Sequence, residues 1–391
     1  MVFFDAYCKL DISTDIEVRV GDIVNYVRDE YSISPEDFCE FKENVEPFMT
    51  RLDAYVRDQM QIKKYKKEKL VEFVVLLNRV RAHDQMIFLF AHVLNEIQNG
   101  PVSSDYRRLV GDLSNLDTIV TFNWDTLLDH VLDQYTDWCP DNGYSVIFRN
   151  ILDGTWRKQS NQGLNKSINY LKLHGSTNWL VNYMTWHLTS GNRIMISLQE
   201  SNKGFTRISV DPKYTESIMD GKYIPPTIED VDWEGIPPPG PNDPEGYPNL
   251  FIDGSKGYAS YKNRFRTGYE VYSYFFPPND PETHIPLMPL MIPPTQYKLY
   301  DEYAHIIDPL WDYALEQLSK SDNVFVIGYS LPKTDIRSLQ MFQKADIASK
   351  PEWIIVNPYP EDIVERLVKE GGISQERIHV EAATLRMFLG N

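Results

Sequence analysis

The chain has 391 residues, of which 42% are hydrophobic and 24% charged, and its formal net charge is −17. This is the composition of a folded globular protein with room for one large domain or two ordinary ones. The acidic balance argues against direct binding to nucleic acid or to an anionic membrane surface, because both need basic patches. The three widely spaced cysteines offer neither a disulfide framework nor a structural zinc site. No stretch resembles a signal peptide or a membrane span, so we expect a cytoplasmic protein.

Residues 20–100 are predicted to form a helical module. The segment Ser34-Pro35-Glu36-Asp37 is a typical helix start, with Ser as the N-cap, Pro in the first turn and acidic residues after it. A helical pattern of apolar residues then runs from Tyr65 to Gln98 and is followed by Asn99-Gly100-Pro101, a combination that commonly stops a helix. An apolar stripe of this kind indicates a packed core and not a cofactor site.

The stretch from Ile119 to Leu132 predicts a short buried strand, an abrupt polar turn and a helix. An amide, Asn123, and a carboxylate, Asp125, therefore stand at the carboxyl end of a strand. In open α/β sheets this is where ligands bind. Either side chain could instead only cap the helix, since Asn and Asp satisfy the free N–H groups of helix starts. We assign the cap to Asp125, where both roles can hold together, and a functional role to Asn123.

A second polar residue follows a second predicted strand. Tyr170 to Leu173 reads as a buried strand that delivers His174 to its end, where Gly175 permits a tight turn. A histidine in such a place is often only a hydrogen-bonded structural residue. The presence of polar groups at two strand ends favours a shared site.

Two more apolar strands are predicted at 323–327 and 353–356, as expected for parallel sheet buried on both faces. The first ends in Gly328 and Ser330, where the backbone can approach a ligand and a hydroxyl can bind it. The second ends in Asn357. Polar or glycine residues therefore follow four predicted strands.

We predict an α/β protein with a Rossmann-like parallel sheet, an N-terminal helical module and a long Pro-rich insertion. The insertion spans 185–294, where prolines crowd among Trp, Tyr, Asn, Asp and Gly, with a hairpin expected in Arg193 to Leu198. Loops of this length are usually lids, binding loops or mobile segments. The Rossmann-like core then comprises 101–184 and 295–391, within a single domain that covers 1–391.

The set of strand ends resembles the sirtuin family, in particular the sirtuin-like NAD-cleaving proteins of bacterial anti-phage defence. Thr121-Phe122-Asn123-Trp124-Asp125 resembles the family's T-x-N-x-D turn, and Leu173-His174-Gly175-Ser176 resembles its catalytic histidine-glycine motif. Gly328-Tyr329-Ser330-Leu331 is similar to the G-x-S-L segment near the ribose, and Val356-Asn357-Pro358 to the I-N-x turn beside adenosine. The resemblance spans about residues 117–360.

Two features depart from the family pattern. The zinc-binding cysteine pairs of deacetylating sirtuins are missing, which points to NAD hydrolysis and away from protein deacylation. The family also opens with a strand and a Gly-Ala-Gly-x-Ser phosphate-binding turn, whereas Val2 to Tyr7 has Asp5 and Tyr7 where glycines would be needed. Either the first strand lies upstream of this sequence, or part of the nucleotide site has been lost. The otherwise intact downstream set favours the first explanation.

The resemblance implies an NAD+ hydrolase that takes NAD as its substrate, needs no metal and releases nicotinamide and ADP-ribose. Asn123 would orient the nicotinamide ribose and the attacking water, and His174 would act as general base. Asp125 would orient nicotinamide or stabilise developing positive charge. The residues assigned to NAD binding are Thr121, Phe122, Gly175, Gly328, Ser330 and Asn357.

Defence hydrolases of this kind imply a homo-oligomer or a partner protein of a defence system. Two alternatives stay open at this point. The chain could be a catalytically impaired module that binds nucleotide or ADP-ribose and acts through a partner, as the missing Gly-rich turn would suggest. It could also be an NAD-dependent protein deacylase, which would need a channel for acyl-lysine.

Overall fold

The computed structural model of the protein describes residues 16–60, scattered positions from 79 to 98, and residues 102–153, 155–160, 168–182, 194–198, 281, 287–296, 298 and 303–390. Most of the insertion predicted at 185–294 lies outside the described residues. The same holds for the segment Val2 to Tyr7 and for most of the helix predicted at 65–98.

The chain divides into two compact units, each assembled from several segments. Unit 1 comprises Met1–Asn99, Arg149–Arg157 and Thr177–Thr295, and unit 2 comprises Gly100–Phe148, Lys158–Ser176 and Gln296–Asn391. Every residue assigned to a site from the sequence belongs to unit 2.

Unit 1 begins with the predicted N-terminal helices, α2 (Ile16–Tyr31), η1 (Pro35–Glu40) and α3 (Val45–Met60). Ser34 caps η1 as expected, because its hydroxyl accepts the Asp37 N–H, although the element is a 3-10 helix and not an α-helix. Tyr26 and Phe48 pack edge to face at 5.3 Å between ring centroids. Cys39 is disulfide-bonded, which the cysteine spacing did not predict, whereas Cys139 is free.

The sheet of unit 1 has the order β3-β2-β6-β5-β7. Its strands are β2 (Asn150–Asp153), β3 (Thr155–Arg157), β5 (Gly175–Asn182, whose first two residues belong to unit 2), β6 (Met195–Leu198) and β7 (Leu287–Met291). The hairpin expected in Arg193 to Leu198 is wrong, since β6 is a single strand that pairs parallel with β2 and antiparallel with β5. Leu180, Met195 and Leu287 form a buried apolar cluster on this sheet.

In the described part of unit 2, the strands form two separate parallel sheets. In one, β1 (Thr118–Thr121) pairs with β4 (Asn169–Lys172); in the other, the order is β10-β9-β8, from β8 (Asn323–Ile327), β9 (Glu352–Val356) and β10 (Ile378–Glu381). The predicted α/β class with parallel strands is thus present, but these five strands do not form one continuous sheet. The expectation that 323–327 is buried on both faces is wrong, because Phe325 is 54% exposed.

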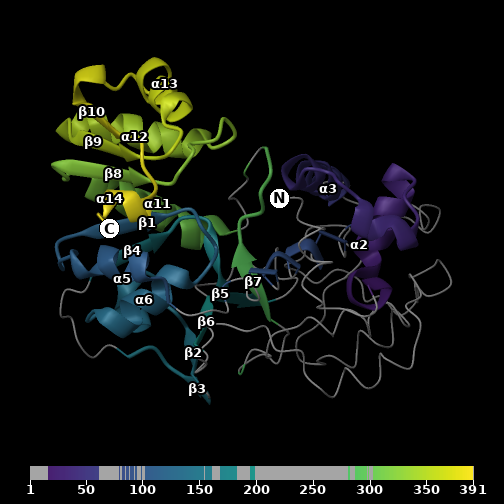
Figure 1. The fold of residues 1–391 in the computed structure, drawn as a ribbon. Helices are drawn as coiled ribbons and strands as arrows, with labels where there is room; N and C mark the ends of the chain where they lie inside the picture. Colours follow the sequence, from purple (N-terminus) through teal and green to yellow (C-terminus); the bar gives the residue numbers. More distant parts are fainter. Residues whose placement is uncertain are drawn as a thin grey trace. The chain divides into compact units, whose positions relative to one another are not determined.

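Helices complete unit 2, and one group covers a face of the three-stranded sheet (Figure 1). Phe342 of α12 (Ile336–Ser349) packs against Trp353 of β9 at 5.3 Å, and α13 (Glu361–Lys369) buries Ile363 and Leu367. The remaining helices are α5 (Ser104–Gly111), α6 (Leu127–Tyr135), α7 (Pro140–Gly143), α11 (Ala304–Leu318), η6 (Gln375–Arg377) and α14 (Leu385–Phe388). Within the described ranges, no helix is both long and apolar enough to cross a membrane.

Candidate functional site

The carboxyl ends of β1 and β4 lie side by side. The two strands pair in parallel with Thr121 opposite Lys172, and the Leu173 N–H continues the ladder by donating to the Thr121 carbonyl at 3.0 Å. Asn123 lies two residues after the end of β1, and His174 lies two residues after the end of β4. The pairing register therefore brings the two predicted catalytic positions to the same edge of this sheet.

An aromatic contact joins this edge to the carboxyl end of β8. The rings of Phe122 and Tyr329 stack with centroids 4.3 Å apart and planes 19° apart. Phe122 also lies against the His174 ring, at 5.3 Å between centroids. The segment after β8 therefore adjoins the segments after β1 and β4.

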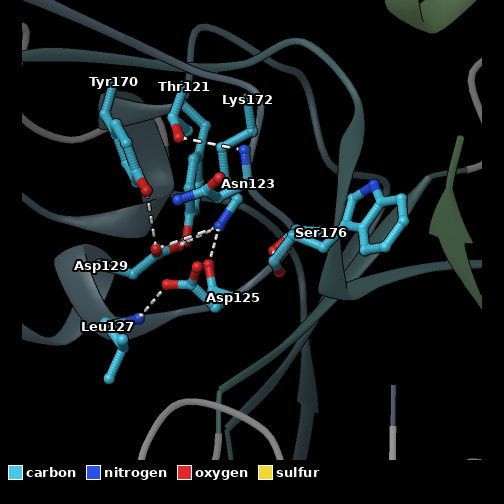
Figure 2. A network of polar contacts seen from close by, with 10 residues as sticks. Thr121, Asn123, Asp125, Leu127, Asp129, Tyr170, Lys172 and Ser176 are labelled. Atoms are coloured by element: carbon cyan, nitrogen blue, oxygen red, sulfur yellow. Dashed lines mark hydrogen bonds and ion pairs between the residues drawn. The ribbon is translucent and has the colours of Figure 1, made fainter. Parts of the chain in front are cut away.

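The turn that carries Asn123 is held by hydrogen bonds on both sides of that residue (Figure 2). The Asn123 N–H donates to Thr121 Oγ1 at 3.1 Å, and the fully buried Ser176 hydroxyl donates to the Trp124 carbonyl at 3.2 Å. Asn123 itself is exposed. The backbone of the turn is thus fixed, and the exposed Asn123 amide offers a donor and an acceptor to a ligand.

Asp125 starts the helix that follows this turn. Its Oδ1 accepts the Leu127 N–H at 3.1 Å and so satisfies a free N–H group at the start of α6. The N-cap position of α6 is Thr126, whose side chain makes no capping bond, so Asp125 supplies this hydrogen bond from the residue before the N-cap. The Asp125 carbonyl is bound in turn by the ammonium of Lys172.

Beneath the turn lies a buried ion pair that sequence reasoning missed. Lys172 Nζ is 3.1 Å from Asp129 Oδ2, and both side chains are fully buried. The hydroxyls of Tyr144 and Tyr170 donate to the same carboxylate. Burial raises the pKa of Tyr170 well above 10, and the negative charge of Asp129 adds to the effect. The available signal was a lysine inside the otherwise apolar run from Tyr170 to Leu173.

His174 is 4% exposed and packs against the rings of Phe122 and Trp311, which also contact each other. It hydrogen-bonds the Phe122 backbone, and its Nε2 is 3.9 Å from Asp335 Oδ2. Burial, and after it the ammonium of Lys298, lower the pKa of His174 to about 3, although the carboxylate of Asp335 opposes both. His174 is therefore neutral at neutral pH, and its contact with Asp335 is not an ion pair there.

Asp335 is the second site residue that sequence reasoning missed. It is 2% exposed, and its Oδ2 accepts hydrogen bonds from Lys298 Nζ at 3.1 Å and from the Tyr329 hydroxyl at 2.5 Å. Burial raises the pKa of this carboxyl, but the neighbouring cation and the hydrogen bonds outweigh burial, so the pKa lies below its usual value. An aspartate at the start of a helix reads as an N-cap, which is why the sequence did not single it out.

The other predicted binding residues are less closely connected. Gly175 and Gly328 have φ of +79° and +66°, conformations that favour glycine, and a Cβ at Gly328 would meet only open space. Ser330 is exposed, and Asn357 Oδ1 accepts the Tyr359 N–H at 2.9 Å in a local turn. Across the described residues, no hydrogen bond joins Gly328, Ser330 or Asn357 to the side chains of Asn123 or His174.

The sequence matches no model of a known protein family, and a search of curated proteins finds no match either. Its chemistry must therefore be inferred from the site. In the part of the chain that the structure describes, no group of three or more His, Cys, Asp or Glu side chains could hold a metal ion. What the site offers is an exposed amide, a stacked aromatic pair, and a buried imidazole beside a carboxylate and an ammonium group.

Proposed function

We propose that this protein is an NAD+ hydrolase of the sirtuin-like type, which releases nicotinamide and ADP-ribose. The observation that carries the proposal is the parallel register of β1 and β4, which sets exposed Asn123 and buried His174 at one edge. Ligands of α/β proteins bind outside the carboxyl ends of such strands. A flat nicotinamide or adenine ring would find an apolar wall in the stacked pair of Phe122 and Tyr329.

The reaction asks for positioning more than for strong catalytic groups, because nicotinamide leaves from a cationic centre. The oxygen of water forms a bond to the anomeric carbon of the ribose while the bond from that carbon to the nicotinamide nitrogen breaks. The electron pair of that bond goes to nicotinamide, which leaves neutral. Asn123 orients the ribose and the water, and His174 takes the proton that the water loses.

We further propose that the two parallel sheets of unit 2 belong to one Rossmann-like arrangement. The stacking of Phe122 on Tyr329 supports this, because it brings the carboxyl ends of β1 and β8 together. NAD depletion in anti-phage defence would be the biological role, with activity controlled by a homo-oligomer or by a partner protein. Asp125 then both caps α6 and faces the nicotinamide end of the substrate.

The test is to incubate the purified chain with NAD+ and to follow nicotinamide release. Removing a positioned general base or orienting group typically lowers the rate 10²- to 10⁴-fold, so Asn123→Ala and His174→Ala should each lose about 10²-fold or more. Lys320→Ala is the matched control, because Lys320 lies just after the end of α11, where it forms an exposed ion pair with Glu316. If neither the wild-type chain nor a version extended upstream releases nicotinamide, the hydrolase proposal fails.

The low pKa of His174 favours a second candidate, a module that binds ADP-ribose without turnover. A general base works best with a pKa near the operating pH, and a pKa of about 3 is far below it. Calorimetric titration with ADP-ribose separates the two candidates. Binding that depends on Asn123, together with no nicotinamide release from the extended chain, would establish the module instead of the enzyme.

A further inference from the structure

Asp335 occupies the N-cap position of α12 but does not cap it. An aspartate there normally accepts an N–H of the first helical turn, and the Asp335 side chain makes no such bond. Its Oδ1 is instead buried without a hydrogen-bond partner. A buried carboxylate oxygen in this state is costly, so its retention calls for an explanation other than helix stability.

The other oxygen of the same carboxylate is crowded. Oδ2 accepts Lys298 Nζ at 3.1 Å and the Tyr329 hydroxyl at 2.5 Å, and that hydroxyl also lies 3.1 Å from Ser338 Oγ. His174 Nε2, at 3.9 Å, is beyond hydrogen-bond distance. A neutral imidazole carries one ring proton, and the hydrogen bond to the Phe122 backbone accounts for it. Protonation of His174 puts a proton on both ring nitrogens, so Nε2 then becomes a donor that faces Asp335.

We propose that Asp335 is the positioning residue of His174, and that Lys298 holds the pair in a resting arrangement from which an anionic ligand releases it. When His174 takes up a proton, that proton faces Asp335, whose carboxylate accepts it in a hydrogen bond. An anionic group such as the pyrophosphate of ADP-ribose draws Lys298 away from Asp335 and so leaves the carboxylate free for His174. The inference rests on the proposed hydrolase only in naming His174 as the base.

Of the charged residues around His174, Lys298 is the one that an anionic ligand can displace. The charged groups that act on the imidazole are Asp335, Lys298 and Arg337. Arg337 is engaged elsewhere, since it pairs with Asp308 at 2.7 Å and stacks 4.6 Å from the Trp311 ring centre. Lys298 has a flexible stem, its side chain is 14% exposed, and Asp335 is its ion-pair partner. A phosphate arriving from solvent can therefore recruit this ammonium group.

The experiment is an NMR titration of His174, assigned by comparison with His174→Gln. In Lys298→Gln the pKa of His174 should rise by about one unit or more, because the ammonium group that lowers it is removed. Addition of ADP-ribose should raise it in the wild-type chain and have little further effect in Lys298→Gln. Lys320→Gln, which breaks an exposed ion pair at the C-terminal end of α11, should leave it unchanged. In Asp335→Asn the pKa of His174 should fall.

Two outcomes overturn the inference: an unchanged pKa of His174 in Lys298→Gln, or no response of the wild-type His174 signal to bound ADP-ribose. Because Asp335→Asn can unfold the chain, Lys298→Gln carries the decision. If nicotinamide is released, the acidic limb of the kcat/KM profile should also move to higher pH in Lys298→Gln. If the protein releases no nicotinamide but the pKa of His174 still changes with ADP-ribose, the hydrolase proposal fails and the positioning role of Asp335 and Lys298 stands. If the protein releases nicotinamide but the pKa of His174 does not change with ADP-ribose, the hydrolase proposal stands and the positioning role fails.

Discussion

At the scale of single residues, Lys172 links the interior of unit 2 to the turn that presents Asn123. Its ammonium group contacts both the buried carboxylate of Asp129 and the backbone carbonyl of Asp125. Ion pairs that are fully buried seldom add stability over apolar residues of the same size, because both charges lose their hydration. The pair instead positions the turn that carries Asn123, because the ammonium group of Lys172 binds the Asp125 carbonyl at the end of that turn.

Breaking the pair from one side should therefore be severe. Lys172→Met leaves Asp129 buried and uncompensated, and the free energy of unfolding should fall by about 3–5 kcal/mol, measured by urea denaturation. The double variant Lys172→Met with Asp129→Leu removes both charges, and it should recover only part of that stability, because the buried hydroxyls of Tyr144 and Tyr170 lose their acceptor. Nicotinamide release or ligand binding should stay impaired. If Lys172→Met is as stable as the wild type, Lys172 and Asp129 do not form an ion pair in solution.

The same residues show what the sequence could and could not reveal. Asn123 and His174 could be found because an apolar run ending in a polar residue is a local pattern, and parallel strands end at a common edge. Asp335 and Asp129 could not be found from the sequence. Each lies on a predicted helix where an acidic side chain is expected at the cap or on the solvent face, and only the fold shows that it is buried.

At the scale of elements, the segment after α6 shows how aromatic packing overrides a strand pattern. The run Tyr144 to Phe148 reads as a strand, but the structure has the short helix α7 followed by irregular backbone, and the next strand begins at Asn150. Trp138 and Tyr144 pack edge to face at 4.9 Å, and both are buried. These side chains are used to fill the core of unit 2 and not to form a sheet face.

Gly143, the last residue of α7, should tolerate no side chain. A Cβ at this position would overlap the indole ring of buried Trp138, so Gly143→Ala forces the aromatic cluster apart. Overpacking of this kind typically costs about 1–3 kcal/mol, which a urea midpoint would measure. Gly111→Ala, at the end of α5, is the control, because a Cβ there meets nothing within 4 Å. The prediction fails if the two alanine variants are equally stable.

At the scale of the whole molecule, the α/β class could be read from the order of apolar runs, but the division into units could not. Arg149–Arg157 joins unit 1 although the chain before and after it belongs to unit 2. The cause is the pairing of β2 with β6, whose residues are far apart in the sequence. Such pairings depend on long-range packing, which local periodicity does not encode.

The net charge of −17 is a property of the whole chain, and it should make stability depend on salt. Excess like charge destabilises a compact state by self-repulsion, and salt at about 0.1 M screens charges more than about 10 Å apart. At pH 7 the urea midpoint should therefore rise as NaCl is increased from about 0.01 M to about 0.15 M. The control is the same series at pH 5, close to the sequence pI of about 4.9, where net repulsion and its screening should nearly vanish. A midpoint that falls with salt at pH 7 would mean that attractive surface pairs, such as Lys369 with Glu365, outweigh the net repulsion.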